Sequence, residues 1–150
     1  FMPGSYLRYA VDFDGDGATD LRANAADAIG SVANFLRRHG WQPGAPVQLR
    51  ARANGEDHAQ FVSLDPVPRH TIFELSQAGV QAGNGALPAD TRAALLRLQT
   101  PERPADYRLG LQNFYVLTRY NRSLFYGMSF TELADELRAA RRKPRAGAGG

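Results

Sequence analysis

The sequence predicts an α+β protein that is mainly α, and three features support this class. The chain has 150 residues, of which 43% are hydrophobic and 22% are charged, as is typical of a globular protein that buries a core. Apolar residues recur at helical spacing near both ends of the chain. Apolar and polar residues alternate in the middle. Helices around one small sheet are typical of the α+β class.

The clearest helix is predicted to start at a capping residue, Asp27, and to stop at Gly40. Basic residues just before Gly40 would complement the dipole at the helix end. Its predicted buried face consists of Ile29, Val32, Ala33 and Leu36.

The middle of the chain, about 46–110, is predicted to form a small inserted antiparallel β-subdomain. Residues 54–55 are Asn-Gly, a dipeptide that favours a hairpin between two strands. The alternating pattern breaks at prolines and glycines, which predict loops. The predicted strands are 47–53, 60–64, 93–98 and 107–111.

Two capping boxes predict further helix starts. Residues 71–74 predict a short helix that ends near Gly79, and residues 129–132 predict a start close to the C-terminus. Closing helices are predicted over about 111–140, with a break at residues 121–122.

The net charge of +3 arises in the C-terminal tail. From Glu136 onward five basic residues face one acid, so the preceding part of the chain is close to neutral. Residues 138–150 are predicted to be a basic, Gly/Ala-rich disordered tail, and a nucleic-acid site there is the less favoured alternative. The chain has no cysteine, which excludes disulfides and zinc–thiolate sites. No apolar run is long enough to span a membrane.

Residues 12–17 read Asp-Phe-Asp-Gly-Asp-Gly, the start of an EF-hand-type calcium loop. Calcium binds about six to eight oxygen atoms, and carboxylates at alternate positions of a tight loop can converge on one ion. The twelfth position is Ala23 instead of Glu, so Asp27 is the expected substitute in a longer loop, 12–27. Asp-Gly turns without a metal are the simpler alternative. The predicted ligands are Asp12, Asp14, Asp16, the carbonyl group of Ala18 and Asp27, with Asp20 and Asn24 left open.

Several separated motifs in the same order resemble the lytic murein transglycosylase B family. They are the segment 1–6 (Phe-Met-Pro-Gly-Ser-Tyr), the loop motif at 9–17, the run at 27–41 and the segment 110–123. The resemblance implies a lysozyme-like helical core portion with one structural Ca²⁺ ion and a small inserted β-subdomain. Residues 1–137 would then be the C-terminal part of a catalytic domain.

The resemblance also implies an activity and a location. Enzymes of this family cleave the MurNAc-β-1,4-GlcNAc bond of peptidoglycan and form 1,6-anhydromuramoyl products. We therefore expect a bacterial protein of the periplasm or outer membrane, with any lipid anchor outside this chain. Peptidoglycan glycan strands are the expected partner, nucleic acid is not, and a monomer is expected.

The family's single general acid–base Glu is expected in a segment that precedes Phe1. No catalytic residue is therefore assigned, and the chain alone is expected to be inactive. The alternative function is that of a non-catalytic, calcium-stabilised glycan-binding module. The substrate-binding candidates implied by the resemblance are Phe1, Met2, Tyr120, Asn121 and Tyr126.

Overall fold

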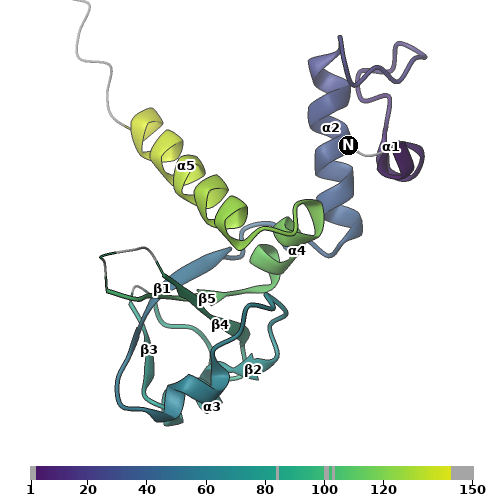
Figure 1. The fold of residues 1–150 in the computed structure, drawn as a ribbon. Coiled ribbons are helices and arrows are strands. Elements are labelled where there is room, and N and C mark those ends of the chain that lie inside the picture. Colours follow the sequence, from purple (N-terminus) through teal and green to yellow (C-terminus); the bar gives the residue numbers. More distant parts are fainter. Residues whose placement is uncertain (1–2, 84, 100–101, 103, 143–150) are drawn as a thin grey trace, which may run out of the picture.

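The computed structural model describes residues 3–83, 85–99, 102 and 104–142. An antiparallel sheet lies between α3 on one side and α4 and α5 on the other, and α1 and α2 stand beyond α4 (Figure 1). This arrangement confirms the predicted α+β class. The elements are α1 (Pro3–Tyr9), α2 (Ala25–Arg38), β1 (Gln48–Ala53), the 3₁₀ helix η1 (Asp57–Phe61), β2 (His70–Thr71), α3 (Ile72–Gln77), β3 (Val80–Ala82), β4 (Arg92–Leu98), β5 (Asp106–Gly110), α4 (Gln112–Tyr120) and α5 (Leu124–Arg142).

The described strands form one sheet in the order β2-β4-β5-β1-β3, and every neighbouring pair is antiparallel. The predicted strands at 47–53, 93–98 and 107–111 correspond to β1, β4 and β5. The predicted strand at 60–64 is wrong, because η1 occupies its start and only Val62 makes an isolated bridge, to Leu95. Both edges of β1 are already paired, with β3 and β5, so β1 has no free edge for that segment.

The core lies on both faces of β4. Leu95 is fully buried on the side of α3, whereas Leu96 is fully buried on the side of α4 and α5. Because successive side chains of a strand point to opposite faces, β4 needs apolar residues at every central position. The sheet therefore joins two apolar clusters into one folded unit.

Phe114 connects α4, β5 and α5. Its side chain is fully buried. A Cβ atom on Gly110 would come within 2.9 Å of the ring, and a Cβ atom on Gly127 would also come within 2.9 Å. Only glycine at both positions leaves room for the ring, so Phe114 packs against bare backbone on two sides.

Arg108 connects the sheet to α5 through a second, polar contact. It is 4% exposed. Its guanidinium binds both carboxylate oxygens of Asp106, donates to Gln48 Oε1 (3.2 Å) and pairs with Glu132 Oε1 (3.4 Å). The hydrogen bonds to Asp106 come first among the causes that raise the pKa of Arg108.

Of the two predicted capping boxes, one is confirmed. Thr71 Oγ1 accepts the N–H of Glu74 (3.2 Å), and Glu74 Oε2 accepts the N–H of Thr71 (2.7 Å) at the start of α3. The box at 129–132 is wrong, because these residues lie inside the continuous helix α5. The predicted break at residues 121–122 is confirmed, since Asn121 is extended.

α5 also continues further than predicted. Residues 138–142 were expected in the disordered tail, but they form the last part of the helix. Alanine and arginine are strong helix formers, which explains the extension. Residues 143–150 lie outside the described residues.

Candidate functional site

α2 begins differently from the prediction. Asn24, not Asp27, is the capping residue, and its Oδ1 accepts the N–H groups of Ala26 and Asp27. Asp27 lies in the first turn and is fully buried. The predicted apolar face is also wrong, since Ile29 is 70% exposed while Ser31 is fully buried. The buried residues of α2 are Asp27, Gly30, Ser31 and Phe35, so two polar side chains share the buried face with one aromatic ring.

The polar face of α2 holds the chain segment 9–13 in place. Polar atoms of three α2 side chains, one or two turns apart, bond to backbone groups of alternate residues in that segment. Buried polar groups are stable when they are hydrogen-bonded in this way. The bonds run from Asn34 Nδ2 to the Tyr9 carbonyl oxygen (2.9 Å), from the Val11 N–H to Ser31 Oγ (2.9 Å) and from the Phe13 N–H to Asp27 Oδ1 (2.8 Å).

The next residues form the aspartate loop, residues 12–20. Asp12 accepts the N–H groups of Gly15 (2.7 Å), Asp16 (3.2 Å) and Gly17 (2.9 Å). These bonds, that of Gly17 first, lower the pKa of Asp12. The glycine φ angles of 77° and 90° at positions 15 and 17 allow the turn that brings the N–H groups round. The loop thus keeps Asp12 ionised.

Three of the predicted ligands meet at one point. Asp12, Asp14 and Asp27 each place a carboxylate oxygen within 4.8 Å of the others. Calcium–oxygen bonds measure about 2.3–2.6 Å, so two ligands of one ion lie at most about 5 Å apart. Asp27 is buried, whereas Asp12 and Asp14 are exposed. One buried and two exposed carboxylates at this spacing fit a Ca²⁺ ion.

The other side chains considered for the metal, Asp16, Asp20 and Asn24, lie outside this three-carboxylate group. Asp16 Oδ1 accepts the N–H of Ala18 (2.8 Å), and Asp16 is not part of the three-carboxylate group. Asp20 accepts two N–H groups of the turn that follows it, which lowers its pKa. Asn24 donates to Asp14 Oδ2 (2.8 Å) and so acts as a support of one predicted ligand.

Aromatic side chains from separate elements meet at the end of α4. The ring of Tyr120 lies edge-on to that of Phe35, with centroids 5.3 Å apart. Phe35 in turn stacks on His39 (4.0 Å) and meets Tyr9 edge-on (4.9 Å). Tyr120 is 37% exposed, so part of this residue is accessible to a ligand.

Tyr126 lies near Tyr120 and extends the aromatic surface onto α5. Partial burial, and then the proximity of Tyr126, raise the pKa of Tyr120, so its hydroxyl stays protonated at neutral pH. Tyr126 stacks on Phe130, with centroids 6.2 Å apart. Sequence reasoning missed Phe130, although its position four residues after Tyr126 on a helix was a usable signal.

The structure says less about the three other substrate-binding candidates. Asn121 is exposed directly after α4. Phe1 and Met2 lie outside the described residues. The structure therefore brings together Tyr120 and Tyr126 and places Asn121 beside them in the chain.

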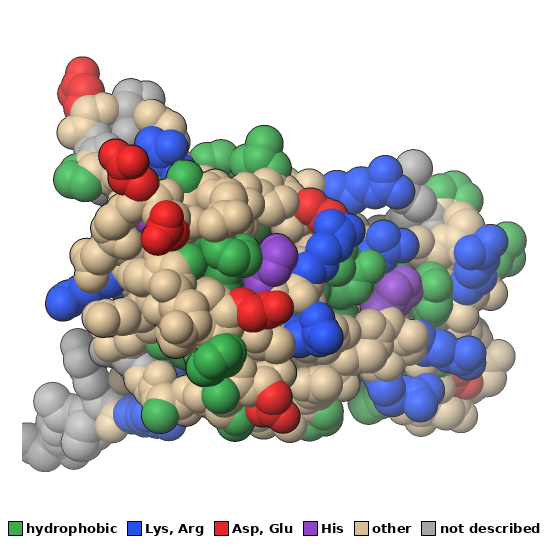
Figure 2. All heavy atoms as spheres, turned by 90° about the horizontal axis from the view of Figure 1, so that it is seen from below, with side chains coloured by type: hydrophobic (Ala, Val, Ile, Leu, Met, Phe, Trp, Pro, Cys, Tyr) green, Lys and Arg blue, Asp and Glu red, His purple; other side chains and the backbone are tan. Residues whose placement is uncertain are grey.

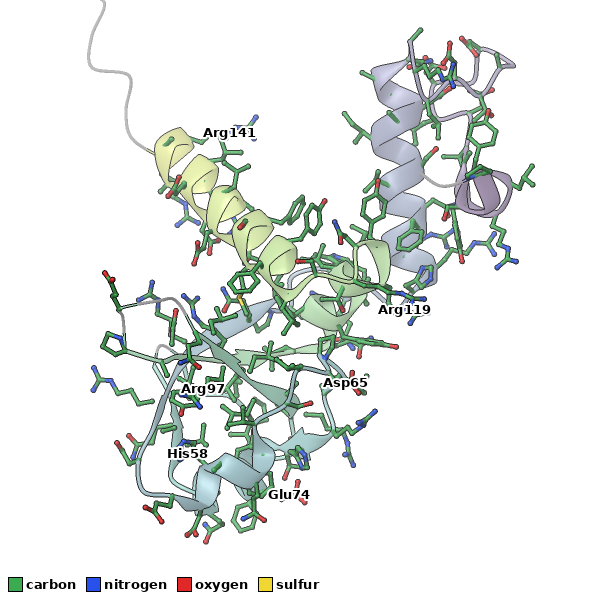
Figure 3. All side chains as sticks on the ribbon, viewed as in Figure 1. His58, Asp65, Glu74, Arg97, Arg119 and Arg141 are labelled. Carbon is green, nitrogen blue, oxygen red and sulfur yellow. The ribbon has the colours of Figure 1, made fainter. Side chains whose placement is uncertain are left out.

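All five glutamates of the sequence fall within the described residues, and all five are exposed. Glu74 caps α3, where bonds from Thr71 lower its pKa, and Figure 3 shows it on the side of the sheet away from α4. Glu132 pairs with Arg108. A general acid needs a pKa raised toward neutrality, usually by burial. The described glutamates do not have such surroundings.

Comparisons with known proteins agree on one family. The family model of the transglycosylase SLT domain matches residues 1–135. Membrane-bound lytic murein transglycosylase B of Escherichia coli strain K12 is 40% identical over 141 residues, which cover 94% of this chain and 37% of that protein.

Solved structures of three bacterial proteins are similar to this chain in both fold and sequence. Soluble lytic transglycosylase SltB1 of Pseudomonas aeruginosa superposes with a TM-score of 0.85 and 40% identity, covering 95% of this chain and 46% of that one. Escherichia coli Slt35 in complex with calcium has a TM-score of 0.81 and 38% identity, with coverage of 95% and 44%. SltB3 of Pseudomonas aeruginosa in complex with NAG-NAM-pentapeptide has a TM-score of 0.76 and 34% identity, with coverage of 92% and 37%.

The chain spans less than half the length of each of these proteins. In the part of the chain that the structure describes, no helix combines the length and the apolar character needed to cross a membrane.

Proposed function

The chain belongs to the lytic transglycosylases of the SLT-domain family, and we propose that it forms the C-terminal part, residues 1–137, of a catalytic domain that cleaves peptidoglycan. The family-model match over residues 1–135 carries this proposal, together with 40% identity over 141 residues to a lytic murein transglycosylase. The reaction proposed is cleavage of the MurNAc-β-1,4-GlcNAc bond with formation of 1,6-anhydromuramoyl ends. The protein would act as a monomer in the periplasm or at the outer membrane.

In this proposal the chain supplies a wall of the glycan site and not the general acid. The aromatic pair Tyr120 and Tyr126 is suited to a sugar, because a ring can pack on a pyranose while its hydroxyl donates a hydrogen bond. The exposed positions of all five glutamates support a general acid outside residues 1–150.

We further propose that the aspartate loop and Asp27 bind a structural Ca²⁺ ion. The spacing of Asp12, Asp14 and Asp27 supports this, and so does the calcium in the complex of Slt35. The ion would neutralise the buried Asp27 and fix the segment 9–13 on α2. Asp16 and the carbonyl group of Ala18 would complete the ligand set.

The test is digestion of purified peptidoglycan sacculi. The 150-residue chain is expected to bind sacculi and to release no anhydromuropeptides, whereas a longer form with the Glu-bearing segment before Phe1 releases them. Release by the chain alone would show that its acid is present after all. Binding by both forms without release by either would favour the second candidate, a calcium-stabilised glycan-binding module, which the exposed glutamates also fit.

A further inference from the structure

We propose that a cavity at the start of α4 binds the peptide stem of peptidoglycan, an inference that rests on the function proposed above. The cavity has a volume of about 480 Å³ and lies between the loop that follows α2 and the β-subdomain. Gln112, the first residue of α4, lines it, and Tyr120 ends the same helix. One helix therefore joins the cavity to the proposed glycan site.

The walls of the cavity suit a short peptide with a negative end. Prolines and a leucine provide apolar surface for small side chains, while an arginine and a glutamine provide donors. Nη1 of that arginine, Arg92, already donates to the Arg69 carbonyl oxygen (2.6 Å), which holds the guanidinium in place. A peptide that is attached to muramic acid through its amino end carries a free carboxylate at its other end, and a guanidinium binds carboxylates well. These residues are Pro46, Pro68, Leu87, Pro88, Arg92 and Gln112.

Hydrogen bonds hold the cavity walls in place. Asn113 is fully buried and donates to the carbonyl oxygens of Gln42 (2.8 Å) and Ala45 (3.0 Å), which fixes the loop after α2. On the opposite wall the Ile72 N–H donates to the Thr91 carbonyl oxygen (2.9 Å). A cavity whose walls are already ordered costs a ligand less binding free energy than one that must form.

The distance between the cavity and the proposed glycan site determines how long a peptide stem must be to reach the cavity. Gln112 and Tyr120 are eight residues apart in α4, which corresponds to about 12 Å along the helix axis. An extended pentapeptide spans about 17 Å, whereas a dipeptide spans about 7 Å. A stem of five residues on a sugar at Tyr120 therefore reaches the cavity, and a stem of two residues does not.

The surface between the two sites is suited to an anionic chain. Tyr115 and Arg119 lie on the same side of α4 as Gln112, at spacings of three and seven residues, and the Arg119 guanidinium lies 6.0 Å from the centre of the Tyr115 ring. Figure 3 shows Arg119 beside α4 on the side of α2. Seen from below, arginine side chains gather on the half of the face toward α2 (Figure 2). Arg92 and Arg119 are both exposed.

Binding of two defined ligands to the calcium-loaded chain tests the inference. Isothermal titration calorimetry compares NAG-NAM-pentapeptide with the same disaccharide carrying a dipeptide. The pentapeptide form is expected to bind at least tenfold more tightly. Arg92→Gln is expected to reduce this preference to less than threefold and to leave the affinity for the dipeptide form unchanged. Arg97→Gln, at another exposed arginine in the same strand, is the control and is expected to keep the full preference.

A second measurement does not depend on any variant. In NMR spectra the backbone amides of Leu111 and Gln112 are expected to shift with the pentapeptide form and not with the dipeptide form. Equal affinities for the two ligands, without these shifts, would overturn the inference and leave the glycan site standing. If neither ligand bound at all, the glycan-binding function would fail together with the inference.

Discussion

The ring of Phe13 lies directly on the backbone of Gly30, so that a Cβ atom on residue 30 would come within 2.5 Å of two ring carbons. This contact fixes the second residue of the aspartate loop against α2. The close approach includes the Cβ atom of Phe13, which cannot move without the backbone. Gly30 is therefore a positioning residue for the loop.

Gly30→Ala is expected to lower the free energy of unfolding by about 1–3 kcal/mol, as overpacking of a tight contact does. The double variant Phe13→Ala with Gly30→Ala is expected to recover only part of this loss, because it removes the ring but keeps the Cβ atom of residue 13, which would lie 2.6 Å from the new Cβ atom. Urea denaturation measures the free energy of unfolding of the single and of the double variant. Gly4→Ala, in α1 with no atom within 4 Å of its new Cβ, is the matched control and should not destabilise the chain. Equal losses in the single and double variants would contradict the contact.

Calcium is expected to raise the melting temperature of the chain. At about 100 times its dissociation constant the ion adds about 2.7 kcal/mol, which corresponds to a shift of roughly 5–10 °C for a chain of this size. Asp14→Asn removes one exposed carboxylate and is expected to abolish most of the shift. Asp135→Asn, at a surface ion pair with Arg138, is expected to keep it. Thermal melts with calcium or with EDTA measure the shift, and its absence in the unmodified chain would refute the metal site.

The sequence predicted local features well where one short signal decides the structure. The capping box at Thr71, the glycine that follows α2 and the alternating strand β1 all agree with the structure. The aspartate loop predicted three carboxylates that do meet, although Asp27 lies in the first turn of α2 and does not cap it. Such features depend on hydrogen bonds between near neighbours.

The errors arose where contacts distant in the sequence decide the structure. Apolar periodicity pointed to Ile29, but α2 buries Ser31 and Asp27 because their oxygens accept N–H groups of the segment 9–13. Buried polar side chains such as these leave no signal in a hydrophobic pattern. Likewise, the two strands that pair with β1, β3 and β5, both come after α3 and not directly after the Asn-Gly turn, a choice that depends on sheet order.

Arg108→Ala is expected to destabilise the fold by about 2–4 kcal/mol, because the buried guanidinium holds Asp106, Gln48 and Glu132 together. Arg108→Lys is expected to recover only part of this, since a single ammonium group cannot reproduce the planar, bidentate contact. Arg138→Ala removes an exposed ion pair of α5 and is expected to cost less than about 1 kcal/mol. Denaturant midpoints rank the three variants, and an Arg108→Ala midpoint equal to that of Arg138→Ala would contradict the network.

Stability is expected to fall as the pH drops below about 5, in part through Glu74. The bonds from Thr71 lower the pKa of Glu74 from its usual value of 4.5. A carboxylate with a lowered pKa in the folded state stabilises the fold above its unfolded pKa, and this contribution disappears as the pH falls toward the folded pKa. Glu74→Gln is expected to flatten this part of the profile, measured as melting temperature against pH between 3 and 7 in EDTA. Glu136→Gln, at an exposed glutamate of α5, should leave the profile unchanged, and an unaltered profile for Glu74→Gln would refute the role of the capping box.

Tyr120→Phe is expected to weaken binding of peptidoglycan fragments by about three- to tenfold, the effect of losing one hydrogen bond of roughly 0.5–1.5 kcal/mol. The ring remains and keeps its edge-on contact with Phe35, and thermal melts of the variant separate a loss of stability from a loss of binding. Because the pKa of Tyr120 is raised, its hydroxyl is a donor throughout the neutral range, and the loss should not depend on pH between 6 and 8. Tyr107→Phe, whose hydroxyl bonds to His58 in the β-subdomain (3.0 Å), is the matched control and should bind the fragments normally. Calorimetry with NAG-NAM-pentapeptide decides the matter: if Tyr120→Phe bound as tightly as the unmodified chain, its hydroxyl would not contact the glycan, and a role for Tyr120 would be limited to stacking.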